Sequence, residues 1–350
     1  MASRAGLAGG GARNKTRYQP PLTHSSWVNI KGGWYKLPHP PEPAMSPAPL
    51  SAAPARDQGR LQGLVMLAIT ACSWGFNWPV SKFLLGELPP FAMRTLCCGG
   101  GAVFAFALAA GRGETLRPPA GQWPRLIAFA AMNYGAFTIL TTLALFWLPA
   151  SQAVIVTYTL PIWAAVLAWP MLGERPTPAR VLATALGLAG VALLVTGQPQ
   201  VTAAAAGPSW TRPAGFACGL AAAFVFGLGT VIAKRAPLRM PPVTGVAWQA
   251  TLGTLPVVAL AAFEPVRLAA VTPLGWGAIA YVAVLPMSLA YLAWFRALRL
   301  LPANTAATGV LLAPAVGVFA SAVMLHEALG WHQLAALALT LAGVALAARG

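Results

Sequence analysis

Several polar side chains lie inside long apolar stretches of this sequence, where each must find a hydrogen-bonding partner. Inside a membrane, side chains of this kind tend to face the protein interior. There an amide would donate and accept hydrogen bonds, and aromatic rings would form the walls of a site for a small-molecule substrate. For any single Tyr or Trp, a place in the aromatic belt at the membrane surface is an equally good interpretation. The cavity candidates are Asn77, Tyr134, Tyr158, Trp248, Gln249 and Tyr291.

The charged residues that could do chemistry stand near the ends of the apolar stretches. Lys82 and Arg94 bracket one short loop, where a cation can extend its side chain to water at little cost. This position leaves two roles open: a contact at the membrane interface, or the steering of an anionic or carboxylate group of a substrate. Glu174 and Glu327 also lie near ends, and we interpret them as helix-end contacts, with a gate as the alternative.

None of the seven carboxylates falls at the middle of an apolar stretch. Their positions argue against a buried proton relay and against a counter-ion for multidrug cations. The expected substrate is therefore neutral, zwitterionic or weakly anionic, such as an amino acid. The four cysteines lack zinc-type spacing, and His326 with His332 is too small a set for a metal site. We predict neither a metal nor a cofactor. The carboxylates are Glu42, Asp57, Glu87, Glu114, Glu174, Glu264 and Glu327.

The overall composition predicts that these residues are positioned within a lipid bilayer. Charged residues make up 9% of the chain and hydrophobic residues 57%. A soluble domain usually carries about 25% charged residues, so this chain has too few to cover a water-exposed surface. The net charge of +16 does not indicate nucleic acid, because the cations are spread over short gaps between apolar stretches.

Ten apolar stretches follow residue 61, and each is 17 to 22 residues long. About 20 residues cross the hydrocarbon core as a helix. Residues 1–60 are instead rich in Pro, Gly and Ala, and we expect a disordered cytoplasmic tail. The two short stretches, 180–197 and 332–348, have a tilted or re-entrant segment as their alternative. The expected spans are 62–81, 91–110, 126–146, 150–171, 180–197, 214–233, 243–262, 274–294, 303–324 and 332–348.

The sequence contains an internal duplication. Residues 148–174 align without a gap with residues 301–327, at a shift of 153 residues. Each copy has five expected spans, and an odd number places the second copy upside down relative to the first. Inverted repeats of this kind are typical of secondary transporters. We predict an all-α integral membrane protein of ten transmembrane helices, in two inverted five-helix repeats at 61–197 and 214–348.

A proline stands near the middle of the fourth and of the ninth span. Pro161 and Pro314 each remove a backbone donor, so the carbonyls of Thr157 and Val310 lose their usual partner. Unpaired backbone groups at this depth are tolerated where side chains or water satisfy them. We expect both kinks to line the cavity and to act as hinges, and a static kink that improves packing is the alternative.

The distribution of basic residues predicts the orientation. If the spans alternate in direction, 19 of the 23 Lys and Arg residues fall on the side of the N-terminus. Basic residues are enriched in cytoplasmic segments. The N-terminus and the C-terminus are therefore both expected in the cytoplasm.

Two ordered copies of short motifs resemble the EamA-type family of the drug/metabolite transporter superfamily. The first copy carries SWGFN at 73–77 and PPFAMR at 89–94, and the proline-centred spans end in Gly-Glu and His-Glu. The resemblance covers about residues 61–348. It implies ten transmembrane helices in two EamA repeats, in the bacterial inner membrane, that move small metabolites outward. The second copy has Val246 in place of Arg94 and His326 in place of Gly173, so a site at these positions is asymmetric.

Two other classes of protein remain as alternatives. A membrane-embedded enzyme would need a cluster of acid–base or metal-binding side chains near one membrane face. A scaffold or sensor that transports nothing would not require an inverted duplication. The sequence sets neither the oligomeric state nor the coupling ion.

If the cavity assignment is right, alanine at Asn77 or Tyr158 will lower transport more than alanine at Glu174 or Glu327. The reason is that the first two would contact the substrate, whereas the carboxylates would hold helix ends. Transport assays at matched expression measure the ranking, and the reverse order would count against the assignment.

Overall fold

The computed structural model describes residues 27–30, 33–36, 53–173, 177–197, 208–302, 305 and 309–347. They fall into two units, divided after Ala52. In the first, β1 (Trp27–Ile30) pairs in antiparallel register with β2 (Gly33–Lys36). The sequence did not predict this hairpin, because its small group of aromatic and β-branched residues is surrounded by Pro and Gly. The rest of the predicted tail up to Ala52 lies outside the described residues.

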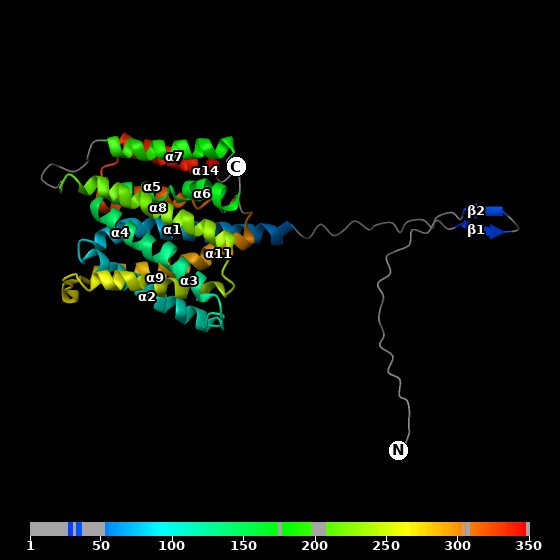
Figure 1. The fold of residues 1–350 in the computed structure, drawn as a ribbon, viewed down its shortest axis with the longest axis horizontal. Helices are drawn as coiled ribbons and strands as arrows, with labels where there is room; N and C mark the ends of the chain where they lie inside the picture. The colour runs from blue at the N-terminus through cyan, green and yellow to red at the C-terminus, as the bar shows by residue number, and fades with distance from the viewer. Residues whose placement is uncertain are drawn as a thin grey trace, which may run out of the picture. The chain divides into compact units, whose positions relative to one another are not determined.

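The second unit is entirely helical, and α1 begins within the segment that was expected to be tail (Figure 1). Its elements in chain order are α1 (Ala53–Leu84), α2 (Pro90–Gly111), α3 (Trp123–Phe129), η1 (Ala130–Ala136), α4 (Phe137–Trp147), α5 (Ala150–Thr157), α6 (Leu160–Leu172), α7 (Pro178–Thr196), α8 (Thr211–Arg235), α9 (Pro242–Ala261), η2 (Leu268–Ala270), α10 (Pro273–Val284), η3 (Leu285–Leu289), α11 (Ala290–Leu300), α13 (Leu312–Leu325) and α14 (Trp331–Ala347).

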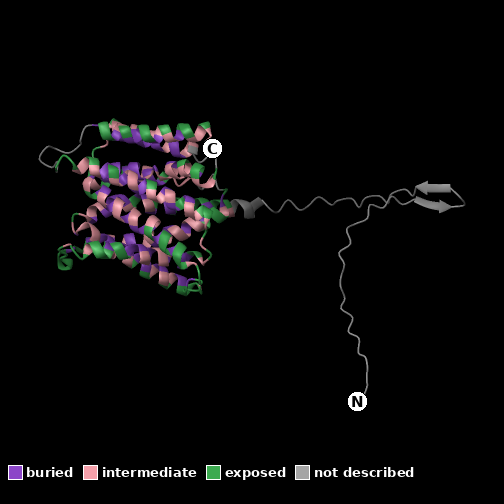
Figure 2. Cartoon of the chain, in the orientation of Figure 1, coloured by how far each residue is buried: buried purple, intermediate pink, exposed green. Residues whose placement is uncertain are grey.

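The helices form a multi-pass membrane protein. In the described part of the chain, eight helices are long and apolar enough to cross a membrane, and Leu312–Leu325 and Trp331–Leu346 are shorter apolar helices. Exposed residues lie on the outer faces of the bundle (Figure 2). Many of them are large and apolar, such as Val103 at 71% and Val323 at 76% exposed. A surface of this kind suits lipid as its solvent.

The two repeats interlock, because most of the strong helix contacts run from one repeat to the other. Helix α2 packs on α9, and α7 packs on α14 (Figure 1). Helix α1 packs on α13 and α11, and its counterpart α8 packs on α6 and α4. Each contact thus has a counterpart in which the repeats exchange roles, as two copies related by a pseudo-two-fold axis require.

Both proline-centred spans are broken a few residues before the proline. The fourth span consists of α5 and α6, and Tyr158 and Thr159 form the turn between them. A turn at Val310 and Leu311 precedes α13 in the same way. The carbonyl of Val310, which cannot accept from Pro314, accepts instead from the N–H of Ala313 at 3.0 Å. A tighter turn replaces the helical bond that proline removes.

A π-helix lies at matching positions of the third and eighth spans. These are η1 and η3, and π-helical segments are rare and often mark functional sites. Two glycines of α2 and α9, 152 residues apart, let them approach closely. A Cβ on Gly253 would lie 2.6 Å from the Cβ of Tyr134, and one on Gly101 would lie 2.9 Å from the Cβ of Met287. The two repeats therefore meet at these backbone contacts near the middle of the helices.

We expect Gly253→Ala to destabilise the helical unit by about 1–3 kcal/mol, the usual effect of overpacking. The added methyl would also approach the backbone nitrogen of Gly135 to 2.8 Å, and backbone atoms cannot move aside cheaply. Gly99→Ala is the matched control, since a Cβ there meets no atom within 4 Å. It should be neutral or stabilising by ~0.5–1 kcal/mol. Thermal unfolding in detergent measures both, and equal stabilities would contradict the close contact.

Candidate functional site

Carboxylates of one repeat hold the helix N-termini of the other. Helices α2, α5 and α9 all have proline at the N-cap, which offers no side-chain acceptor for the first N–H groups. The carboxylate of Glu264 accepts from the N–H groups of Phe91 and Ala92 in α2, at 3.1 and 2.7 Å. Negative charge at this place is also favoured by the helix dipole.

Glu327 makes the same contact with α5. Its two oxygens accept from the N–H groups of Ala150 and Ser151 at 2.6 and 2.9 Å. The preceding residue, His326, ends α13 in the left-handed conformation with φ 55°, which turns the chain so that Glu327 follows the helix end. The end of the bundle that carries Glu264 and Glu327 is called the Glu327 end below. At this end Glu327 is a helix-end contact, the first of its two predicted roles.

The opposite end, called the Glu114 end, has one clasp of this kind in the described residues. Glu114 accepts from the N–H and the hydroxyl of Thr244 in α9, at 2.9 and 3.1 Å. Gly173 ends α6 with φ 75° and thus has the conformation of His326 in the other repeat. Glu174 itself lies outside the described residues, so its predicted role stays a prediction.

Lys82 holds the C-terminus of a helix. Its ammonium donates to the carbonyls of Leu145 and Leu148 at 2.6 and 2.9 Å, at the end of α4. A third contact, to the carbonyl of Phe146, is 3.3 Å long. The last carbonyls of a helix have no partner within it, and a cation satisfies both their hydrogen bonds and the dipole. This geometry accounts for Lys82 without a substrate.

Arg94 does not extend to water, contrary to what its place near a helix end suggested. Its side chain is 4% exposed and joins a hydrogen-bonded string of four polar residues. The Nε group donates to the hydroxyl of Thr142 at 2.9 Å, and Nη1 lies 3.4 Å from the hydroxyl of Ser81. Ser81 in turn donates to the amide oxygen of Asn77 at 3.3 Å. The string thus brings two predicted site residues together.

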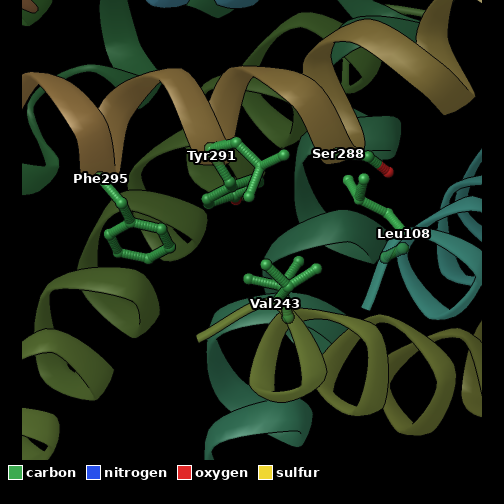
Figure 3. A pocket seen from close by; sticks show the side chains of 8 residues that line it. Leu108, Val243, Ser288, Tyr291 and Phe295 are labelled. Atoms are coloured by element: carbon green, nitrogen blue, oxygen red, sulfur yellow. The ribbon is translucent and has the colours of Figure 1, made fainter. Parts of the chain in front are cut away.

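Two further candidates lie toward the Glu114 end of the same interior. The hydroxyl of Tyr134 donates to the sulfur of Met287 at 3.6 Å, and these two residues occupy equivalent positions of the two repeats. Tyr291 lines a small pocket, which Figure 3 shows between Tyr291 and Phe295 of one span, Val243 of α9 and Leu108 of α2. Its lining is almost entirely apolar, and Ser288 supplies the one other hydroxyl.

Three candidates lie apart from this group. The ring of Tyr158 lies 6.4 Å from that of Trp78, at the break between α5 and α6. Trp248 donates its indole N–H to the carbonyl of Leu116 at 2.8 Å, near the Glu114 end, and its ring packs on Trp123. This is the geometry of an interfacial anchor, the alternative for any Trp. Gln249 donates within its own helix, to the carbonyl of Gly245 at 3.2 Å.

Some interior polar groups were missed by sequence reasoning. Ser81 and Thr142 complete the string around Arg94, and the buried oxygens of Gln152 and Thr157 have no hydrogen-bond partner. Ser and Thr in a helix usually bond the carbonyl four residues earlier, so their presence alone gives no signal. Only the contact to Arg94 distinguishes Thr142 from the other threonines.

The fold and the interior polar string define a polytopic membrane protein built from two inverted repeats. Both halves match the model of the EamA-like transporter family, at residues 61–196 and 213–349. The chain belongs to the EamA-like transporter family, within the drug/metabolite transporter superfamily.

Known proteins of this kind are similar along most of the chain. The "Uncharacterized transporter YvbV" of Bacillus subtilis is 29% identical over 290 residues, which cover 81% of this chain and 90% of that protein. The "Probable amino-acid metabolite efflux pump" of Salmonella typhimurium is 26% identical over 300 residues, with 81% and 94% covered. A crystal structure of a protein 23% identical in sequence has a TM-score of 0.58, over 83% of this chain and 96% of its own, and supports the fold alone.

Replacing Lys82 with Met should lower stability by about 1–3 kcal/mol, because three carbonyls at the end of α4 would lose their donor. Lys82→Arg is the control and should keep most of the stability, since it retains the charge and the donors. Thermal unfolding of the purified protein in detergent, without any substrate, gives both values. If Lys82 acted only on the substrate, the Met variant would unfold at the wild-type temperature.

Proposed function

We propose that this EamA-like protein is a secondary transporter that exports a small neutral or zwitterionic metabolite, such as an amino acid. It would act by alternating access in the bacterial inner membrane, with both termini in the cytoplasm. Under this topology the Glu114 end faces the cytoplasm and the Glu327 end faces outward.

The interlocked inverted repeats are the observation that carries the proposal. Both repeats have a broken helix before a proline and a π-helix at the matching place. Two conformations of similar energy then follow, because the repeats can exchange their local structures. A static scaffold would have no need of this equivalence. In our proposal the breaks before Pro161 and Pro314 absorb the change of backbone angles.

The pocket beside Tyr291 supports an approach to the site from the Glu114 end. It lies between the last turns of α2 and the first turns of α9, both at that end of the bundle. Its volume is about 10 Å³, room for a single water and not for an amino acid. We infer that loading requires α2, α9 and α11 to separate at this end.

The proposed substrate class combines the interior chemistry with one relative. The interior holds hydroxyl, amide, phenol and guanidinium groups, but no carboxylate of the described residues is buried there. Glu87, Glu114, Glu264 and Glu327 each accept hydrogen bonds near a helix terminus. Such a site suits a solute without excess positive charge. The efflux pump of Salmonella typhimurium carries an amino-acid metabolite in its name, which agrees with this class.

Purified protein in liposomes should move at least one labelled amino acid faster than empty liposomes do. Pro161→Ala should lower that flux about tenfold, because continuous helix would replace the break. Pro170→Ala is the matched control, since this proline lies exposed near the end of α6 and away from the break. Counterflow assays with a panel of amino acids measure the rates. Absence of flux for the whole panel would contradict the transport proposal, and a wild-type rate in Pro161→Ala would contradict the hinge.

A further inference from the structure

The pocket at the Glu114 end has a counterpart that the pseudo-symmetry places at the Glu327 end. Val246 and Phe295 line the pocket. In the first repeat, Arg94 is equivalent to Val246 at a shift of 152 residues, and Thr142 is equivalent to Phe295 at a shift of 153. Arg94 donates a hydrogen bond to Thr142 at 2.9 Å. The region equivalent to the apolar pocket is thus closed in this structure and contains a buried guanidinium. We propose that Arg94 binds the carboxylate of the transported solute, an inference that rests on the proposed transport function.

The first argument is the missing counter-ion. Arg94 is 4% exposed, and no carboxylate of the described residues forms an ion pair with it. Its guanidinium has five N–H donors, but the hydrogen bonds of its side chain reach only the hydroxyls of Thr142 and Ser81. A buried cation without a partner is strongly unfavourable, and within a membrane such a residue indicates a function. A carboxylate from the solute would supply the negative charge that compensates the guanidinium.

The second argument is the asymmetry between the repeats. All four members of the string are polar in the first repeat: Asn77, Ser81, Arg94 and Thr142. The equivalent positions of the second repeat are glycine or apolar: Gly229, Ala233, Val246 and Phe295. If the hydrogen bonds of Arg94 served only to hold neighbouring helices together, the second repeat would need similar hydrogen bonds at the equivalent place. The second repeat has no polar side chains there, which indicates that the string serves the solute rather than the fold.

The third argument is the path along α2. Arg94, Cys98, Gly101, Ala105 and Leu108 are spaced by four or three residues and share one face of the helix. Ala105 and Leu108 line the pocket at the Glu114 end. In between, Gly101 lies against Met287 of η3, and its carbonyl accepts from the hydroxyl of Ser288 at 3.0 Å. Closer to Arg94, Cys98 is packed with Tyr134 and Ala250. A solute that enters the pocket would therefore reach Arg94 when these two contacts separate.

The chemistry of guanidinium selects the ligand. Its planar pair of N–H groups matches the two oxygens of a carboxylate, which it binds more specifically than a hydroxyl or an amide. Thr142 and Ser81 act as positioning residues that hold the guanidinium in place when no solute is bound. A zwitterionic amino acid would place its carboxylate on Arg94.

The test compares solutes that differ only in the carboxylate. The pairs are L-leucine with L-leucinol, and L-phenylalanine with L-phenylalaninol, measured in liposomes with wild type, Arg94→Gln and Arg94→Lys. Wild type should prefer the amino acid of each pair. Arg94→Gln should lose about 10- to 100-fold in apparent affinity for the amino acids, as expected for charged hydrogen bonds, and should treat the alcohols as wild type does. Arg94→Lys should keep part of the preference.

A second measurement separates binding from folding. The amino acids should raise the unfolding temperature of wild type in detergent, and should leave that of Arg94→Gln unchanged. Without solute, Arg94→Gln should unfold no earlier than wild type, because it removes an uncompensated buried charge. Arg125→Gln is the matched control for loss of one arginine, since Arg125 is exposed on α3, and it should behave as wild type throughout.

Three outcomes would overturn the inference. In the first, Arg94→Gln keeps the preference for amino acids. In the second, Arg94→Gln loses apparent affinity for amino acids and alcohols equally and unfolds at a lower temperature. In the third, wild type prefers the alcohols. All three would leave transport itself standing. Absence of flux in wild type would instead refute the proposed function. The thermal measurement would then test Arg94 by itself: if the amino acids did not raise the unfolding temperature of wild type, the inference would be wrong.

Discussion

The unsatisfied N–H groups at the start of a helix are the constraint on which this structure depends. Helices α2, α5 and α9 begin after a proline, which cannot cap them. Near a bilayer these groups need a partner within the protein, and each finds a carboxylate of the opposite repeat. Glu114, Glu264 and Glu327 thus hold the two inverted copies together, and no carboxylate of the described residues lies buried in the interior.

That distribution of charge shapes the interior. Among the described residues, one buried arginine, Arg94, has hydroxyl partners only, and both come from its own repeat. Several helices of the bundle are interrupted by turns and π-helices. Breaks of this kind supply polar backbone at membrane depth, where it is tolerated only inside a protein. Glycines at positions 101 and 253 let the π-helices approach the helices of the other repeat.

The equivalence of the repeats is strong in the backbone and weak in the side chains. The broken helices, the π-helices and the left-handed helix ends at Gly173 and His326 occur in both copies. The polar string around Arg94 occurs in one copy only. In our proposal the pseudo-symmetric backbone supplies two mirror-related states, and the asymmetric interior gives the solute one preferred orientation.

The sequence by itself determined the membrane class, the duplication and the broken spans, because hydropathy, a fixed repeat period and proline act locally along the chain. It also singled out Asn77, Lys82, Arg94 and Glu327 as polar groups that needed an explanation. The tertiary structure decided their partners: Lys82 bonds to α4, Glu327 to α5, and Arg94 is enclosed with Thr142. It also placed Trp248 near a helix end. Such partners lie 48 to 177 residues away in the chain, and no local pattern specifies which distant helix end a side chain will meet.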